Sequence, residues 1–377
     1  MPPELLVSAC IPIAWARAGN RSAAGLSVFA LYLAGAREEA WAVARVLPGW
    51  HLRGGLAIWL LHALALTLPW AAGWVSGDGP CRRRCAALLV ILAALALPPL
   101  GLWGWLHPFT LGGWLFPGWG PWGLAAMTGA LLALVCHCRT GLLLAALLSL
   151  AANLIYRAPP LPSGWIAVDT ALPRMQEDAA NRMARQEQLM ALLTPFLSGP
   201  SARAARVLVL PEEIAGPWTA AEAWWWQPLL ARLRAQGTTL VLGAQRPDPG
   251  GLRNGALVIA PTGDSWQLAR QPIPLAEWLP WNGPPFGWRD VRPGTTLNDG
   301  QTWLDGQRVL LSFCFEDLLT LPELATMGLA PRPEVLVGLA NLWWAGGLDE
   351  PAAQRWTVEG WARLWGVPLV RAVNRPG

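Results

Sequence analysis

Apolar stretches fill the first 155 residues, and they constrain what this chain can fold into more than any other feature of the sequence. A helix needs ~20 predominantly apolar residues to cross the hydrocarbon core of a bilayer. The last four stretches reach that length or nearly so, whereas the first two are shorter and predict a hairpin or half-buried helices. The predicted segments are Leu5–Ala16, Ala23–Gly35, Gly55–Val75, Cys85–Leu106, Trp114–Cys136 and Thr140–Tyr156. We therefore predict a multispan α-helical membrane domain over residues 1–156.

Charged residues are scarce along the whole chain. They make up 14% of the 377 residues, whereas a soluble domain averages about a quarter. The 26 tryptophans suit a protein that meets lipid headgroups, where an indole ring sits half in water. The sequence contains no lysine, so all 28 basic residues are arginines. Because the net charge of +4 is small and dispersed, we expect no direct binding of nucleic acid.

The arginines predict how the chain is oriented in the membrane. Arg82–Arg84 and Arg139 lie in loops on one side, whereas the loop Pro108–Gly113 on the other side carries no charge. The positive-inside rule places arginine-rich loops in the cytoplasm. Counting the spans forward, we expect a bacterial inner-membrane protein whose C-terminal domain, after Tyr156, is periplasmic. Three arginines run against this assignment, since it leaves them on the outer side: Arg37, Arg45 and Arg53.

A proline-rich stretch over residues 157–164 is typical of a linker. After it, short apolar runs alternate with amphipathic segments, which predicts an α/β domain over residues 165–377. The predicted strands are Trp165–Asp169, Arg206–Leu210, Thr238–Ala244, Leu257–Pro261, Ser265–Arg270, Arg308–Phe313, Glu334–Ala340 and Val367–Ala372. The predicted helices are Ala179–Leu197, Ala220–Gln236 and Pro351–Leu364.

Cys314 lies at the end of the predicted strand Arg308–Phe313, and Glu316 follows two residues later. The apolar run before it is typical of a strand that is covered on both faces. A cysteine at such a point can be held at a sharp turn with its sulfur facing a pocket, which suits a nucleophile. The alternative is a small buried side chain, because free cysteine is among the most buried residue types.

Charged residues also follow two other predicted strands. Glu212 comes directly after Arg206–Leu210, where a desolvated carboxylate can act as a general base. The alternative for Glu212 is a carboxylate at a helix N-terminus, stabilised by the helix dipole. Arg270 follows the predicted hairpin, with Glu277 seven residues further on. This cation could stabilise an oxyanion, and the alternative is a surface ion pair of little energetic value.

A glutamate, a cation and a cysteine after successive strands, in that order, resemble the nitrilase (carbon–nitrogen hydrolase) superfamily, whose catalytic set is glutamate, lysine and cysteine. Five motifs across Trp165–Asn374 carry the resemblance: Leu210-Pro-Glu212, Pro274-Leu-Ala-Glu277-Trp278, Phe313-Cys314-Phe-Glu316, Ala340-Asn341-Leu-Trp-Trp344 and Leu369-Val-Arg371-Ala-Val-Asn374. With its multispan N-terminal half, the chain is similar to apolipoprotein N-acyltransferases. Its layout looks closer still to TraB-type conjugal transfer proteins, a plasmid-borne branch.

The resemblance implies an α-β-β-α sandwich with Cys314 as the nucleophile and Glu212 as the base. It implies that Glu277 and Glu316 are supporting carboxylates, that the acyl group is carried as a cysteine thioester, and that neither a cofactor nor a metal takes part. Thiol chemistry agrees with these roles, because cysteine needs a neighbouring base to supply thiolate at neutral pH.

The sequence departs from the family in two places. The family lysine is missing, and Arg270 is the cation nearest to its place. Arginine stays protonated, so it can donate hydrogen bonds to an oxyanion but cannot shuttle a proton. The chain also stops at Asn374-Arg-Pro-Gly377, where the acyltransferases continue with further strands and a last membrane helix. We therefore expect a nitrilase-like domain that is truncated at its C-terminus.

Three functions follow from these observations. The first is a membrane-bound N-acyltransferase that moves an acyl group from a membrane lipid through Cys314 to an amine on a membrane protein, in the setting of plasmid conjugal transfer. The second is a catalytically impaired structural component of a conjugative pilus or transfer apparatus, which the missing lysine and the short C-terminus favour. The retained carboxylates favour the first, since a relaxed site should lose side chains that cost free energy to bury. The third, an amidase for a small soluble amide, explains the cysteine but not the apolar half.

Four of the remaining cysteines lie in the two predicted cytoplasmic loops. Cys81 and Cys85 share one loop, and Cys136 and Cys138 flank His137 in the next. Together they could supply zinc with thiolate and imidazole ligands if the loops touch. We favour the alternative, reduced thiols at helix ends in a reducing compartment, because neither spacing is the common pair of metal-binding cysteines.

Overall fold

The computed structural model describes residues 3–47, 49, 51–174, 178–198, 204–249, 251–274, 277 and 298–375. The chain divides into two compact units, each built from several segments. A helical unit comprises Met1–Pro159, Leu318–Gly328 and Leu348–Val367, and an α/β unit comprises Pro160–Asp317, Leu329–Gly347 and Pro368–Gly377. The first change of unit falls inside the proline-rich stretch 157–164.

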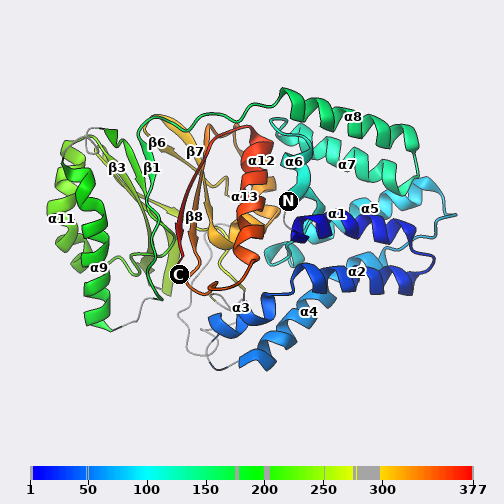
Figure 1. The fold of residues 1–377 in the computed structure, drawn as a ribbon, viewed down its shortest axis with the longest axis horizontal. Coiled ribbons are helices and arrows are strands. Elements are labelled where there is room, and N and C mark those ends of the chain that lie inside the picture. The colour runs from blue at the N-terminus through cyan, green and yellow to red at the C-terminus, as the bar shows by residue number, and fades with distance from the viewer. Residues whose placement is uncertain are drawn as a thin grey trace. The chain divides into compact units, whose positions relative to one another are not determined.

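Helices from the first 155 residues form most of the helical unit (Figure 1). Their bounds are α1 Pro3–Arg17, α2 Arg21–Gly35, α3 Glu39–Val46, α4 His51–Ala72, α5 Cys81–Ala96, α6 Gly112–Leu115, α7 Pro121–Val135 and α8 Arg139–Ile155. Two 3-10 turns, η1 (Leu100–Leu102) and η2 (Pro108–Leu111), lie between α5 and α6. Two helices from the C-terminal half, α12 (Leu321–Leu329) and α13 (Glu350–Trp365), group with this unit, α12 as far as Gly328.

Two of the predicted membrane spans are interrupted. The segment Cys85–Leu106 leaves the helix at Ala96, because two consecutive prolines that cannot continue it follow closely. The segment Trp114–Cys136 breaks between α6 and α7 at Pro117 and Gly118, the latter with φ of +78°. Among the described residues, one helix, α4, is long and apolar enough to cross a membrane. The multispan membrane domain therefore stays a prediction.

Buried aromatic side chains form the centre of the helical unit. Trp15, Tyr32 and Trp70 come from α1, α2 and α4 and are at most 2% exposed. The indole N–H of Trp15 donates to the carbonyl of Trp70 at 2.8 Å, and the indole N–H of Trp70 donates to the Tyr32 hydroxyl at 3.2 Å. The polar atoms of these rings thus have partners, which their burial requires.

Helix α13 packs closely on α6 within this unit. A Cβ atom on Gly113 would lie 1.7 Å from the carbonyl oxygen of Gly360, so the backbones meet where both side chains are absent. The indole of Trp114 donates to the carbonyl of Trp356 at 3.2 Å, and Arg363 donates to the carbonyl of Gly113 at 3.3 Å. A helix from the C-terminal part of the chain is thereby built into the helical unit.

The α/β unit contains two sheets. Sheet A has the order β1-β2-β3-β4-β5, formed by Trp165–Ala167, Val207–Val209, Thr239–Asp248, Gly251–Ala260 and Gly263–Leu268. Its first three strands are parallel and its last three antiparallel. Sheet B has the order β6-β7-β8-β9, formed by Gln301–Leu304, Gln307–Phe313, Val335–Asn341 and Leu369–Asn374. In sheet B, β7, β8 and β9 are parallel, and β6 is antiparallel to β7.

One apolar core joins the two sheets. It contains Val209 and Val241 from sheet A and Leu311 and Val337 from sheet B, all at most 1% exposed. Helices α9 (Ala179–Leu193) and α11 (Ala220–Ala235) pack against sheet A through a second core (Figure 1). An α layer and two β layers of the predicted sandwich therefore lie within this unit.

The sheets differ from the sequence prediction at their margins. The β3–β4 ladder continues to the pair Asp248–Gly251, well beyond the predicted strand ends. Charged and proline residues at this end are typical of a loop, but Arg253 pairs with Asp248 at 2.6 Å across the hairpin. Strand β6 and helix α12 were not predicted, because each is short and lies between stronger signals.

Candidate active site

Cys314 lies where β7 ends. Phe313 is the last residue of the strand, and Cys314 begins the 3-10 turn η5 (Cys314–Leu318). The carboxyl ends of parallel strands meet at one edge of a sheet, so the sulfur lies next to the end of β8, 4.0 Å from the carbonyl oxygen of Asn341. The side chain is 7% exposed. The strand end predicted for this cysteine is confirmed.

Glu212 reaches the same place from sheet A. It follows β2 by three residues and is 7% exposed. Its Oε1 accepts a hydrogen bond of 2.8 Å from the amide of Asn254 on β4. A second hydrogen bond joins its carboxylate to the thiol of Cys314. The base and the nucleophile therefore meet across the two sheets of one unit.

A helix dipole does not account for Glu212. Helix α11 begins at Ala220, where Thr219 is the N-cap residue and Glu222 completes a capping box. Glu212 lies in a turn before that cap. The alternative of a helix N-terminal carboxylate is thus replaced by a buried side chain that points toward Cys314.

Three carboxyl groups interact in this site. Burial raises the pKa of Glu212 well above its usual range, and the charges of Glu277 and Glu213 raise it further. Burial raises the pKa of Glu277 to about 8, again with a contribution from the charge of Glu213. The backbone N–H of Ile273 donates to Glu277 at 2.9 Å and acts in the opposite direction. At neutral pH the site therefore holds at least one carboxyl proton.

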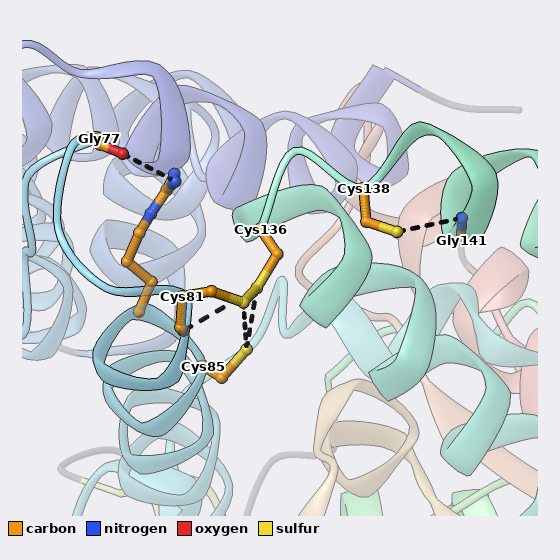
Figure 2. The surroundings of a disulfide bond; sticks show 7 residues. Gly77, Cys81, Cys85, Cys136, Cys138 and Gly141 are labelled. Carbon is orange, nitrogen blue, oxygen red and sulfur yellow. Dashed lines mark hydrogen bonds between the residues drawn. A yellow bond between two sulfur atoms is a disulfide. The ribbon is translucent and has the colours of Figure 1, made fainter.

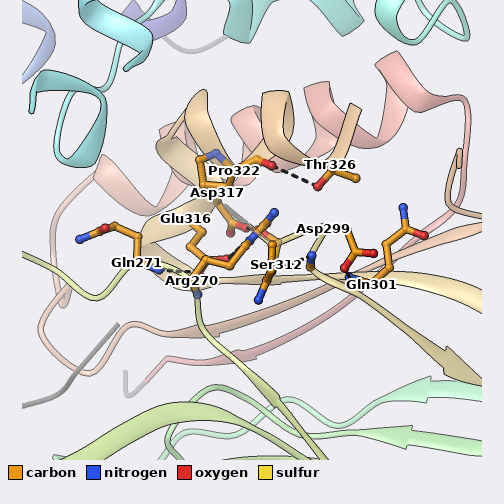
Figure 3. A network of polar contacts seen from close by, with 11 residues as sticks. Arg270, Gln271, Asp299, Gln301, Ser312, Glu316, Asp317, Pro322 and Thr326 are labelled. Atoms are coloured by element: carbon orange, nitrogen blue, oxygen red, sulfur yellow. Dashed lines mark hydrogen bonds and ion pairs between the residues drawn. The ribbon is translucent and has the colours of Figure 1, made fainter. Parts of the chain in front are cut away.

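Glu316 holds Arg270 in a buried ion pair (Figure 3). Both side chains are 1% exposed, and the Nε of Arg270 lies 3.4 Å from Oε2 of Glu316. The other oxygen of Glu316 accepts the backbone N–H of Arg270 and, at 2.9 Å, that of Gln271. Gly300 packs on the guanidinium, since a Cβ there would lie 2.8 Å from Cζ. The alternative of a surface ion pair at Arg270 is thus wrong.

A second ion pair supports the turn that begins at Cys314. Asp317 is fully buried, and its Oδ1 accepts a hydrogen bond of 2.5 Å from the hydroxyl of Ser312 on β7 (Figure 3). Its Oδ2 lies 3.7 Å from the guanidinium of Arg371 on β9. Side chains on both sides of Cys314 are therefore tied to the sheet, which fixes the direction of its Cβ.

Two asparagines fasten the neighbouring strand ends. Asn374 closes β9 and donates to the side-chain oxygen of Asn341 on β8 at 2.7 Å. Its own oxygen accepts from the Thr170 hydroxyl at 2.7 Å and from the backbone of Leu172 at 2.8 Å. This network connects the end of β9 in sheet B to the segment after β1 in sheet A. Hydrogen bonds therefore join the two sheets next to the site.

The predicted residues form two groups. Glu212, Glu277 and Cys314 make up the first, and Arg270 and Glu316 make up the second, which is linked to the first through η5. The sequence prediction missed Asn254 and Glu213. The predicted strand Leu257–Pro261 did not include Asn254, which lies inside β4. In the motif at Glu277, residues 275, 276 and 278 lie outside the described residues.

The cysteine-bearing loops of the helical unit do touch (Figure 2). Cys81 and Cys136 are joined as a disulfide, and the sulfur of Cys85 lies 3.2 Å from that of Cys136. Cys81 and Cys136 are therefore not the reduced thiols that their spacing favoured, whereas Cys85 and Cys138 are not disulfide-bonded. Cys314 is not part of this cluster and is not disulfide-bonded.

The paired sheets, with a strand-end cysteine hydrogen-bonded to a buried glutamate, agree with the arrangement expected of a nitrilase-like domain. No protein-family model matches the chain. It is 32% identical over 388 residues to the conjugal transfer protein TraB of Agrobacterium fabrum, covering 96% of this chain and 86% of that protein. It is 31% identical to the probable conjugal transfer protein TraB of Sinorhizobium fredii, covering 98% and 92%. The chain belongs to the family of these TraB proteins.

Solved structures of the nitrilase superfamily align with part of the chain. A CN-hydrolase superfamily protein from Xanthomonas campestris with an arsenic adduct in its active site shares 13% identity at a TM-score of 0.36, covering 56% of this chain and 77% of that one. A mutant of the Nesterenkonia amidase from the nitrilase superfamily shares 15% identity at a TM-score of 0.37, covering 56% and 78%.

Proposed function

We propose that the chain is a membrane-bound acyl-transferring enzyme of the carbon–nitrogen hydrolase type that serves plasmid conjugal transfer. The observation that carries the proposal is the hydrogen bond between the Cys314 thiol and the buried carboxylate of Glu212. A thiol whose proton passes to a neighbouring base becomes a thiolate nucleophile, which a thioester mechanism needs. The names of the TraB relatives support the link with conjugation.

The proposed reaction has two halves. Glu212 takes the thiol proton, and the sulfur of Cys314 attacks the carbonyl carbon of a lipid acyl ester. The ester C–O bond breaks, the leaving alcohol receives the proton from Glu212, and the acyl group stays on the cysteine as a thioester. The amine of an acceptor protein then attacks the thioester carbon, the C–S bond breaks, and an amide and a free thiol result.

Carboxyl groups carry the proton transfers in this proposal. The chain has no lysine, and an arginine stays protonated at any working pH. Arg270 is held by Glu316 in a buried pair, so we assign Arg270 a positioning role at η5. Glu277, whose pKa burial raises to about 8, is a proton reservoir beside Glu212.

An apolar surface supports the membrane location. Large apolar side chains are exposed along α4 and α8, and monomeric soluble proteins rarely expose contiguous patches of that kind. Those on α4 are Leu52, Leu56, Leu60, Leu61, Leu64 and Leu68, and those on α8 are Leu143, Leu144, Leu147, Leu148, Leu150, Leu154 and Ile155. A bilayer would cover them and would bring lipid acyl esters within reach of the protein. With the arginine loops in the cytoplasm, the α/β unit is periplasmic and the host membrane is the inner one.

A second candidate function is a structural component of the transfer apparatus with an inactive nitrilase-like domain. It is favoured by one observation, the burial of Arg270 against Glu316 in a chain without lysine. A cation neutralised in this way contributes less to an oxyanion than a free one. In this alternative the Cys314 site is retained for packing alone.

Acyl labelling in membranes distinguishes the two. Vesicles containing the full chain are incubated with a phospholipid that carries a fluorescent acyl chain, and the protein is separated under denaturing conditions. The enzyme predicts label on the wild type, release of the label by hydroxylamine, and no label on Cys314→Ala. The matched control Cys10→Ala, which removes an exposed cysteine, keeps the label.

Conjugation frequency completes the test. If catalysis serves transfer, Cys314→Ala lowers plasmid transfer between cells and Cys10→Ala does not. An unlabelled wild type, together with unchanged transfer by Cys314→Ala, would replace the enzyme with the structural component.

A further inference from the structure

Three cysteines from two separate loops form a compact cluster in the helical unit (Figure 2). Cys81 and Cys85 lie in the first turns of α5, four residues apart and hence on one face of the helix. Cys136 is the C-cap residue of α7. The three sulfurs lie within 4.8 Å of one another, at 3.9 Å between Cys81 and Cys85 and 3.2 Å between Cys85 and Cys136.

The backbone beneath the cluster is held in place. Arg84, between the two cysteines of α5, is 3% exposed. Its guanidinium donates to the carbonyl of Ala16 at 3.2 Å and to that of Gly77 at 3.3 Å. These bonds tie the start of α5 to α1 and to the preceding loop. Cys81 and Cys85 therefore lie on a helix end whose position is fixed, and a ligand-binding site needs such a rigid support.

The surroundings suit an anionic ligand set. Cys81 is the first residue of α5, in the turn where a helix dipole stabilises a negative charge. Arg82 and Arg83 share the same turn, and their charges offset those of several thiolates. A disulfide uses only two of the sulfurs and leaves the third, on Cys85, without a role in the bond.

The expected compartment decides against a lasting disulfide. The loop with three consecutive arginines belongs in the cytoplasm by the positive-inside rule, and disulfides rarely persist there. A cytosolic dithiol would reduce the Cys81–Cys136 bond to two thiols and would itself be oxidised to a disulfide. Three thiols would then face one another, and a divalent metal ion would displace their three protons.

We propose that Cys81, Cys85 and Cys136 bind a thiophilic divalent cation of the zinc class, which joins the ends of α5 and α7. Zinc–sulfur bonds of about 2.3 Å in a tetrahedron separate the sulfurs by about 3.8 Å, close to the 3.9 Å between Cys81 and Cys85. Reduction lets the sulfurs of Cys81 and Cys136 separate to a similar distance. Among the described residues the group has three ligands, so one position remains for water. The site is independent of the chemistry at Cys314.

Cadmium titration tests the site directly, because cadmium thiolates absorb in the ultraviolet and zinc competes for the same ligands. The full chain is purified in detergent with a phosphine reductant, freed of metal and titrated with Cd²⁺. We expect saturation at one ion per chain and displacement by Zn²⁺. Each of Cys81→Ser, Cys85→Ser and Cys136→Ser should weaken binding by at least the roughly 10–100-fold typical of losing an outer-shell partner.

The variant at Cys85 separates the proposal from a structural disulfide. Cys85→Ser leaves the Cys81–Cys136 bond possible but removes a metal ligand, whereas the matched controls Cys10→Ser and Cys138→Ser change only exposed cysteines. Circular dichroism without metal shows whether each variant keeps its helices. The proposal is overturned if the reduced wild type gives no thiolate absorption with Cd²⁺, if Cys85→Ser binds as well as the controls, or if alkylation in intact cells finds Cys81 and Cys136 linked.

Discussion

The guanidinium of Arg270 and the carboxylate of Glu316 form an ion pair of 3.4 Å with both side chains 1% exposed. Arg270 follows the last strand of sheet A, and Glu316 lies in the turn that begins at Cys314. The pair therefore connects the end of one sheet to the nucleophile turn of the other. Its position indicates that the cation of this family member holds the site together.

Breaking this pair should destabilise the α/β unit strongly. Glu316→Ala leaves the guanidinium of Arg270 buried without its carboxylate, which costs about 3–5 kcal/mol. The measurement is the unfolding temperature of the full chain in detergent. Glu334→Ala is the matched control, because that exposed carboxylate accepts only a single surface hydrogen bond among those described, from the backbone of Arg308. Equal shifts for the two variants would show that the buried pair contributes nothing special.

The amide of Asn254 should tune the base. Its hydrogen bond to Glu212 favours the charged carboxylate, so Asn254→Ala raises the pKa of Glu212 further. Because the base accepts the thiol proton only when it is ionised, the pH at which Cys314 becomes reactive moves upward. Alkylation of Cys314 by iodoacetamide across a pH series measures this. The control is Gln301→Ala, whose amide bonds the backbone of Pro331. An unchanged pH profile in Asn254→Ala would argue against Glu212 as the base.

Stability of the α/β unit should depend on the protonation of Glu277. The pKa of Glu277 rises from an ordinary glutamate value to about 8 on folding. At any pH between these two values, the folded chain therefore binds more protons than the unfolded chain. The contribution of Glu277 to the free energy of unfolding is complete below its pKa in the unfolded chain. It is lost as the pH rises through its pKa in the folded chain, and the free energy of unfolding falls by at most about 1.4 kcal/mol per pH unit. Glu277→Gln should therefore reduce the fall in unfolding temperature between pH 5 and pH 8. A fall as steep as that of the wild type would contradict the assignment.

The contact between α6 and α13 predicts a large effect of one methyl group. Gly113→Ala places a Cβ atom 1.7 Å from the carbonyl oxygen of Gly360. The two helices must move apart, and overpacking of this kind typically lowers the free energy of unfolding by about 1–3 kcal/mol. Gly129→Ala on α7 is the control, because a Cβ there meets no atom within 4 Å and alanine favours the helix. If both variants unfold at the same temperature, the close approach does not stabilise the helical unit.

The sequence predicted the strand-end residues of the site well. Buried runs before Glu212 and Cys314 mark where β2 and β7 end. These strands belong to different sheets, so the packing of the two sheets, which the sequence does not show, brings the two residues together. The ion partner of Arg270 could not be predicted, since Glu316 is 46 residues away and only the packing of the two sheets brings them together. The buried state of Arg270 was missed for the same reason.

Helix lengths and the cysteine cluster show what periodicity leaves open. An apolar run alone did not reveal that the segment Cys85–Leu106 ends its helix at Ala96, although the prolines that follow carry that signal. The pairing of Cys81 with Cys136 depends on how α5 and α7 pack, and their separation of 55 residues gives no hint of it. Asn254 was missed because the predicted strand began at Leu257, whereas β4 begins at Gly251.

The most direct test of the account is to look for an acyl group on Cys314 itself. Full chain in native membrane vesicles is digested without reductant, and the peptide that contains residue 314 is analysed by mass spectrometry. We predict a thioester adduct on Cys314 of the wild type. In Glu212→Gln this adduct should form at least 10²-fold more slowly, because a general base contributes roughly 10²–10⁴-fold to the rate. An unmodified Cys314 in the wild type, or an adduct that forms equally fast in Glu212→Gln, would contradict the mechanism.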